Sequence, residues 1–269
     1  MGQTLGYRDF VSAFRELGLG ASSRVLAHAS LSAFGEVRGG AETLAGALIG
    51  SFETVIVPSF TIGCMVIPEV GPPNNALDYT QGQAWNQKAE IFHPDMPADR
   101  SMGRVAESVR LSEGARRSSH PLLSFAGLHA EDFLAAQSLE DPWAVVGALA
   151  DADGDLLLLG VDHRVNSSLH YAEQKAGRPQ FVRWALTQEG IVECPGWPGC
   201  PDGFNAIRTR LGGIAGQVRL GPATLETVPL RDLVNVAVGW IREDPLALLC
   251  DRPSCPRCQA IREAWNASR

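Results

Sequence analysis

The order of elements near the start of the chain constrains the fold most strongly. Residues 23–29, SRVLAHA, form a short apolar run that is typical of a strand, and residues 54–60, TVIVPSF, form another. Between them lie a loop, SLSAFGEVRGG, and a stretch with helical character, AETLAGALI. A strand, a helix and a second strand in this order predict a βαβ unit, whose two strands run parallel.

Later stretches extend the same pattern. The run LLLLGV, which follows Gly154 and Asp155, predicts another buried strand. Apolar residues recur at helical spacing in Met102–Leu111 and in PWAVVGALAD, and ATLETVPLRDLVNVAVGWI reads as a strand followed by a helix. FVRWALTQEGIVEC predicts two strands joined by a turn. We therefore predict an α/β fold, a single domain over residues 1–269 with a largely parallel central sheet flanked by helices.

One long segment, residues 61–101, departs from this pattern. It contains five prolines, from Pro68 to Pro97, and little periodicity. Connections between elements usually have about 4–6 residues, and much longer ones are often functional. We expect residues 61–101 to form a lid-like insertion that helps to shape a binding site.

Charge and hydropathy exclude two classes of partner. The 269 residues carry a formal net charge of −7, and the arginines are scattered, which argues against a nucleic-acid-binding face. No apolar run approaches the roughly 18 residues that a membrane span needs. Residues 1–10 lack the basic and apolar regions of a secretory signal, so we expect a cytoplasmic protein without nucleic-acid or membrane partners.

The cysteines allow two interpretations. Residues 194–269 form a cysteine-containing tail, in which Cys255 and Cys258 make a Cys-x-x-Cys pair. Together with Cys250 and Cys200 this pair could hold a tetrahedral zinc ion. A reducing compartment disfavours disulfides, and reduced thiols without metal are the simpler interpretation. We assign no metal from the sequence and keep structural zinc as the alternative.

Two loops carry groups suited to binding. In HASLSAFGEVRGG, Ser30 and Ser32 offer hydroxyls, and Gly39 and Gly40 directly precede a helix, whose free N–H groups can bind phosphate. The loop matches no standard phosphate-binding pattern, so a simple glycine turn is the alternative. RSSHP, residues 117–121, places a histidine after two serines, and its alternative is an ordinary helix-to-strand loop.

The stretch GDLLLLGVDHRVNSSLHYAEQKAGRP, residues 154–179, carries the most chemistry. A buried strand ends, a polar loop follows, and a helix opens with His170, which shares one face with Glu173 and Gln174. Ligands of open α/β sheets bind outside the carboxyl ends of the strands. An imidazole titrates near pH 6.5 and suits proton transfer, although a structural histidine is equally compatible with this pattern.

Taken together, these stretches resemble the aminoglycoside 3-N-acetyltransferase family. The similarity runs in order through HASLSAFGEVRGGAETLAGAL, VPSFT, RSSHPLLSFAGLHAEDFL, GDLLLLGVDHRVNSSLHYAEQKAG and LRDLV. It extends from about residue 10 to about residue 240. The long middle segment matches poorly.

The resemblance implies an acetyl-CoA-dependent enzyme with His170 as general base. Glu226 matches best as the carboxylate that orients the imidazole, and Glu173 is the local alternative. His28, at the end of the first strand, is either a second active-site histidine or a buried strand-end residue. Acetyl-CoA would be bound by His28, Ala29, Ser30, Leu31, Ser32, Gly35, Val37, Gly39, Gly40, Ser119 and His120.

The resemblance also implies that the acceptor is the 3-amino group of an aminoglycoside. Asp78, Glu90, Asp95 and Glu173 are the carboxylates that could pair with its ammonium groups, although solvated loop charges explain the first three equally well. Two other functions stay open. One is an acyltransferase that acts on a different small amine, and the other is a non-catalytic CoA-binding or zinc-ribbon protein.

Overall fold

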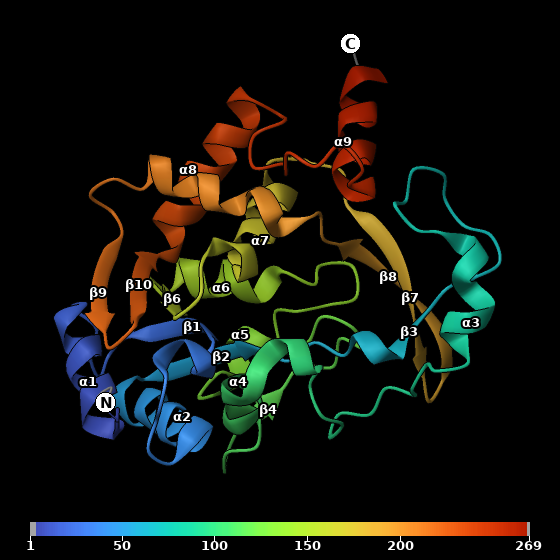
Figure 1. Cartoon of the computed structure of the whole chain (residues 1–269). Helices are drawn as coiled ribbons and strands as arrows, with labels where there is room; N and C mark the ends of the chain where they lie inside the picture. Colours follow the sequence, from blue (N-terminus) through green and yellow to red (C-terminus); the bar gives the residue numbers. More distant parts are fainter. Residues whose placement is uncertain (1–3, 268–269) are drawn as a thin grey trace.

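The computed structural model describes residues 4–267, so residues 1–3 and 268–269 of the predicted domain lie outside it. Within the described part, a seven-stranded sheet forms the centre of the molecule, in the order β4-β5-β2-β1-β6-β10-β9 (Figure 1). The predicted α/β fold class is confirmed. The strands are β1 (Arg24–Ala29), β2 (Thr54–Pro58), β4 (Arg116–Arg117), β5 (Phe125–Leu128), β6 (Asp155–Leu159), β9 (Gly216–Leu220) and β10 (Ala223–Pro229).

Strand direction changes across the sheet. β1 pairs parallel with β2 and with β6, as the βαβ pattern predicts. The pairs outside this centre, β6–β10, β10–β9, β2–β5 and β5–β4, are antiparallel, so the sheet as a whole is mixed. Only Gly221 and Pro222 separate β9 from β10, and so short a connection can join only antiparallel neighbours.

Helices cover both faces of the sheet, which explains why the middle residues of its central strands are apolar on both sides. Val25 and Leu157 face one core cluster, and their chain neighbours Leu26 and Leu156 face the other. On the first face lie α1 (Tyr7–Glu16), α2 (Gly40–Ser51) and α4 (Gly103–Arg110). On the second lie α5 (Glu131–Leu134), α6 (Ala144–Asp151), α7 (Ser168–Lys175) and α8 (Leu230–Glu243).

A second, three-stranded sheet stands beside the first, at the right of Figure 1. It contains β3 (Met65–Val66), β7 (Phe181–Thr187) and β8 (Gly190–Trp197), all antiparallel. β7 and β8 are the two strands predicted from FVRWALTQEGIVEC. The irregular segment 61–101 supplies β3 and the short helix α3 (Gly82–Asn86).

Hydrogen bonds hold this irregular segment against the second sheet. The side-chain amide of Asn86 accepts from the backbone N–H of Ile67 at 2.8 Å and donates to its carbonyl at 2.9 Å. Further along, the N–H of Phe92 donates to the carbonyl of Leu186 at 2.8 Å. The segment is therefore anchored at several points in spite of its irregular backbone.

The remaining elements connect and close the fold. The terminal helix α9 (Pro256–Ala267) stands apart from the central sheet, at the top of Figure 1. Within residues 4–267, no helix has the length and apolar character needed to cross a bilayer. The 3-10 helices are η1 (Leu31–Phe34), η2 (Ile62–Cys64), η3 (Tyr79–Gln81), η4 (Arg100–Met102), η5 (His163–Val165) and η6 (Pro201–Arg210).

Candidate active site

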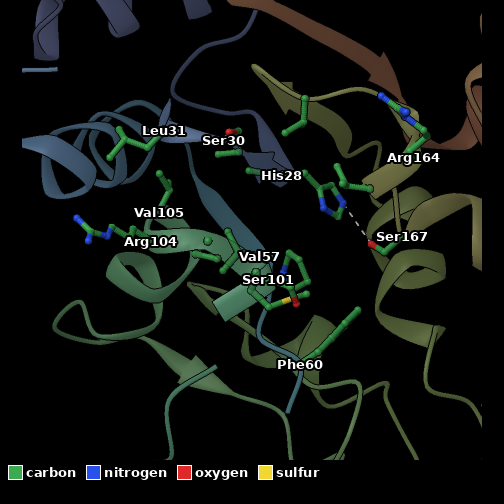
Figure 2. Close-up of a pocket in the computed structure, with 18 of the residues that line it drawn as sticks. His28, Ser30, Leu31, Val57, Phe60, Ser101, Arg104, Val105, Arg164 and Ser167 are labelled. Atoms are coloured by element: carbon green, nitrogen blue, oxygen red, sulfur yellow. Dashed lines mark hydrogen bonds between the residues drawn. The ribbon is translucent and has the colours of Figure 1, made fainter. Parts of the chain in front are cut away.

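A cavity of about 800 Å³ opens beside the carboxyl ends of the parallel strands β1 and β2. This is the end of an α/β sheet at which ligands are expected. Side chains from β1, η5 and α4 line it, among them His28, Arg164 and Arg104, which are labelled in Figure 2. The polar residues that line it include His28, Ser30, Ser101, Arg104, Arg164 and His170.

The charge of the cavity wall favours an anionic ligand. Arg104 and Arg164 contribute to the lining, and no described carboxylate does, although the chain as a whole carries a net charge of −7. Arg164 is paired with Asp162 at 2.8 Å, whereas Arg104 has no ion-pair partner among residues 4–267. The first residues of α4, from Gly103 to Ala106, also line the wall, and a helix N-terminus favours negative charge.

His170 and Glu173 form a buried pair at the edge of the cavity. One turn of α7 separates them, and His170 Nδ1 lies 2.8 Å from Glu173 Oε2. Although burial alone would raise the pKa of Glu173, the hydrogen bond from His170 and the charge of Arg178 hold that pKa below its usual value. Since an ionised carboxylate can only accept, Nδ1 carries a proton and donates it to Glu173.

The surroundings of this pair hold it in one orientation. The His170 ring packs between Trp143 and Phe204, with ring centroids 5.3 Å and 4.8 Å away. Behind it, Arg178 donates to Glu173 Oε1 at 2.7 Å and to the carbonyl of Ala247 at 2.6 Å. No described residue forms a hydrogen bond with His170 Nε2, so this nitrogen is available to a ligand in the cavity.

A second buried pair lies nearby, between His163 and Glu226. His163 Nε2 is 2.7 Å from Glu226 Oε1, and the other ring nitrogen, Nδ1, is 3.1 Å from the side-chain amide of Asn166. Arg208 and Gln217 donate to the remaining carboxylate oxygen of Glu226. Both nitrogens of this imidazole are therefore occupied, and His163 does not line the cavity.

His28 stands at the end of β1, with Nε2 3.2 Å from Ser167 Oγ (Figure 2). Its pKa falls to about 3, first because the ring is buried and then because His163 and His170 are close. At neutral pH the imidazole is therefore uncharged. It adds a polar but neutral group to the cavity wall beside His170.

Comparison with known proteins identifies the family. The sequence profile of the aminoglycoside 3-N-acetyltransferases matches residues 26–242. The chain belongs to the aminoglycoside 3-N-acetyltransferase family. Aminoglycoside N(3)-acetyltransferase VII from Streptomyces paromomycinus is 29% identical over 266 residues, which cover 84% of this chain and 88% of the relative.

Solved structures share the family fold. The apoenzyme of the aminoglycoside acetyltransferase AAC(3)-IVa superposes with a TM-score of 0.80 at 24% identity, over 98% of this chain and 99% of that protein. The binary complex of AAC-IIIb with CoASH gives a TM-score of 0.73 at 22% identity, over 90% of this chain and 97% of that protein. At these identities the likeness concerns the fold alone.

The loop predicted to bind the cofactor, residues 28–40, has two parts in the structure of this acetyltransferase. The first part reaches the cavity, and the second, with Val37, Gly39 and Gly40, does not. The difference arises because Val37 forms a bridge with Leu5, which holds this end of the loop against the N-terminal segment. The predicted residues that line the cavity are His28, Ala29, Ser30, Leu31, Ser32 and Gly35.

Ser119 and His120 also lie outside the cavity lining. Ser119 is exposed, whereas His120 is buried and accepts hydrogen bonds at Nδ1 from the N–H groups of Leu122 and Leu123. Burial lowers the pKa of His120 to about 4. A neutral histidine in this position stabilises the turn that leads into β5.

The carboxylates predicted to bind substrate lie in different environments. Asp78, Glu90 and Asp95 are exposed and do not line the cavity, and Asp78 caps η3 by accepting from the N–H of Thr80 at 3.0 Å. Glu173 is fully buried behind His170. Glu226, predicted as the partner of His170, contacts His163, and it is Glu173 that contacts His170.

Several residues of the site escaped the sequence interpretation. Arg104 gave no signal, because a basic residue in a predicted surface helix is ordinary. It reaches the cavity because α4 packs closely on β1, where a Cβ added to Gly103 would lie 3.4 Å from the carbonyl oxygen of Ala29. His163 and Arg164 lie within residues 154–179, the stretch that contains His170. Their short distance from His170 along the chain could have identified them as candidate site residues.

Proposed function

We propose that this protein transfers the acetyl group of acetyl-CoA to the 3-amino group of an aminoglycoside, with His170 as the general base. The observation that carries the proposal is the arrangement of one imidazole. Its Nδ1 is bound to a buried carboxylate, and its Nε2 has no described partner and borders the cavity. Family membership supplies the reaction class.

The cavity fits acetyl-CoA, which supplies an activated acetyl thioester. Arg104 and the N-terminus of α4 offer positive charge to its phosphates, and Arg164, although it is paired with Asp162, lines the same wall. The apolar side chains of Leu31, Val57, Phe60 and Val105 line the same cavity and would contact the pantetheine arm (Figure 2). The structurally similar AAC-IIIb has been solved as a binary complex with CoASH.

Attack of an amine on a thioester requires the nitrogen to lose a proton. His170 Nε2 would accept it, and the resulting imidazolium would be stabilised by Glu173 at 2.8 Å. Arg178 fixes Glu173 in turn. Because His28 is neutral, it adds no positive charge that would repel a cationic acceptor.

The acceptor entrance is proposed to be shaped by the predicted insertion, residues 61–101. Phe60 and Met102, which flank the segment, and Ser101, its last residue, line the cavity. A lid role requires the loops between these residues to move over this opening from their position against the second sheet. Asp78, Glu90 and Asp95 would then act on a polycationic acceptor through long-range attraction rather than contact. Since acetyl-CoA is a cytoplasmic metabolite, we propose a cytoplasmic location.

The test is acetyl transfer to a panel of aminoglycosides, followed by thiol release and by mass spectrometry and NMR of the product. We expect at least one aminoglycoside to be acetylated at the 3-amino group by the wild type and not by His170→Ala. Binding of CoA without transfer to any aminoglycoside would favour another small amine. Binding of CoA without transfer to any amine would favour a non-catalytic protein.

A further inference from the structure

Four buried cysteines meet at one point near the C-terminus, away from the cavity. The sulfur atoms of Cys200, Cys250, Cys255 and Cys258 all lie within 4.8 Å of one another. We infer that these four thiolates bind a structural Zn²⁺ ion. This site is independent of the acetyl-transfer reaction proposed above.

The geometry suits a tetrahedral ion better than disulfides. Zinc–sulfur bonds of about 2.3 Å in a tetrahedron place the sulfurs about 3.8 Å apart, so small side-chain rotations would complete the site. A disulfide joins only two sulfurs, at about 2.05 Å, so all four cysteines would be satisfied only by two such bonds, and none of them is paired here. All four cysteines are free in the structure, and the N–H of Cys250 already donates to Cys258 Sγ at 3.4 Å.

The four ligands come from two distant segments. Cys200 follows β8, whereas Cys250, Cys255 and Cys258 lie between the end of α8 and the first turn of α9. Cys255 and Cys258 have the Cys-x-x-Cys spacing that is frequent in structural zinc sites. The ion would therefore cross-link the C-terminal segment to the second sheet.

The surrounding charges match such a centre. Four thiolates and one Zn²⁺ carry a double negative charge, and three arginines surround the cysteines. Arg252 lies 3.8 Å from Cys200 Sγ, Arg262 donates to the carbonyl of Cys250 at 2.6 Å, and Arg257 donates to the carbonyl of Gly199 at 2.8 Å. Cationic side chains favour thiolates over thiols. Such a group of arginines fits a negative centre in an acidic protein.

The packing here explains why a metal is needed. The small core of this region is separate from the two large clusters around the central sheet. Half of its buried residues are cysteines, so little aliphatic surface is available to hold the segment. The buried residues are Phe181, Cys200, Leu249, Cys250, Cys255, Cys258, Ala260 and Ile261.

The same two segments support the His170–Glu173 pair from behind. Phe204, shortly after Cys200, packs on the His170 ring, and the carbonyl of Ala247, shortly before Cys250, accepts from Arg178. The segments touch directly at Gly203, where an added Cβ would lie 2.4 Å from the carbonyl oxygen of Leu248. Zinc would thus act as a structural support, without contacting substrate.

Elemental analysis tests the inference directly. Untagged wild-type protein, purified without added metal, should contain close to one zinc per chain, since tight structural sites purify nearly full. Cys258→Ser should lose the zinc, whereas the matched variant Cys194→Ser, at a buried cysteine outside the cluster, should retain it. Less than about 0.2 zinc per chain in the wild type would overturn the site, as would iron in its place.

A second measurement on the wild type covers the case in which Cys258→Ser fails to fold. Titration with a mercurial thiol reagent and a zinc-responsive dye should release one zinc as the cluster thiols are blocked, and a chelator should lower the melting temperature. Mass spectrometry that finds a disulfide among the four cysteines would contradict the inference. None of these readouts depends on acetyl transfer, so this inference and the proposed function can fail separately.

Discussion

Two buried histidine–carboxylate pairs lie close together in this molecule and differ in one respect. His170–Glu173 and His163–Glu226 have nearly equal hydrogen bonds, 2.8 Å and 2.7 Å long. Both carboxylates have lowered pKa values, although burial alone would raise them, because each is bonded to a histidine and lies near an arginine. The contact with a carboxylate therefore does not distinguish a general base from a structural histidine.

The second ring nitrogen makes the distinction. Asn166 occupies Nδ1 of His163, whereas Nε2 of His170 has no described partner and borders the cavity. A base needs a free lone pair within reach of its substrate. On this criterion we propose His170 as the general base and His163 as a structural residue.

The largest loss of activity is expected when the His170 side chain is removed. His170→Ala should lower kcat by about 10²-fold or more, because it removes the proton acceptor, and should leave acetyl-CoA affinity nearly unchanged. Steady-state kinetics and calorimetry measure the two quantities. The matched variant, His163→Asn, should lower the melting temperature, but it should lower kcat of the folded enzyme much less than His170→Ala does. A folded His163→Asn protein that is as inactive as His170→Ala would contradict the proposed distinction between a catalytic and a structural histidine.

The next effect concerns the two carboxylates. Glu173→Gln keeps an oxygen for Arg178 but weakens the support of the imidazolium, so kcat should fall about tenfold or more while KM for acetyl-CoA changes little. Glu226→Gln should reduce thermal stability with a smaller change in kcat. The two variants should be compared at a temperature at which both are folded. Equal losses of kcat would mean that the His163–Glu226 pair also takes part in the reaction.

A third effect tests which side of the site holds the cofactor. Arg104→Ala should raise KM for acetyl-CoA roughly tenfold, because a charge-assisted contact to phosphate is lost, with little change in kcat. Arg116→Ala, at an exposed arginine outside the cavity, serves as control. An unchanged KM for acetyl-CoA in Arg104→Ala would mean that the cofactor does not bind beside α4. It would also weaken the proposal that His170 is the general base.

A smaller effect concerns stability and pH. His28 has a pKa of about 3 in the folded protein and the ordinary value of 6.5 when unfolded, so the unfolded chain binds more protons between these values. Stability should therefore fall as pH decreases from about 7 to about 5, above the range in which glutamates titrate. His28→Asn should flatten this slope without abolishing it, since His120 also contributes.

Glu107→Gln, at a carboxylate that bonds to Arg110 and to no histidine, should leave that slope unchanged, because the lowered pKa of Glu107 matters only below the ordinary glutamate range. Melting temperatures over this pH range provide the measurement. An identical slope in His28→Asn and wild type would mean that His28 is not buried as a neutral group between the two histidine–carboxylate pairs.

The smallest effect is expected at the loop carboxylates. Asp78→Asn and Asp95→Asn should raise KM for an aminoglycoside by about twofold or less at low salt, and not at all at high salt, because both side chains are exposed. Kinetics at two ionic strengths measure this. A tenfold rise would show that residues 61–101 close over the cavity and bring these charges to the substrate beside His170.

The sequence predicted what depends on short separations along the chain. The βαβ unit, the buried strand within LLLLGV, and the proximity of His170 to Glu173 follow from apolar runs and from a spacing of three residues on a helix. The order of motifs was also enough to suggest the family. Each of these features reflects local backbone geometry, which a linear pattern records directly.

The tertiary structure decided which distant groups meet. The antiparallel register of β10 on β6 places Glu226 beside His163, and the bridge from Val37 to Leu5 keeps Gly39 and Gly40 out of the cavity. Packing of α4 brings Arg104 to the cavity wall, and packing of α9 brings Cys200 to the other cysteines. These contacts depend on how helices and strands pack across the whole fold, which no local spacing encodes.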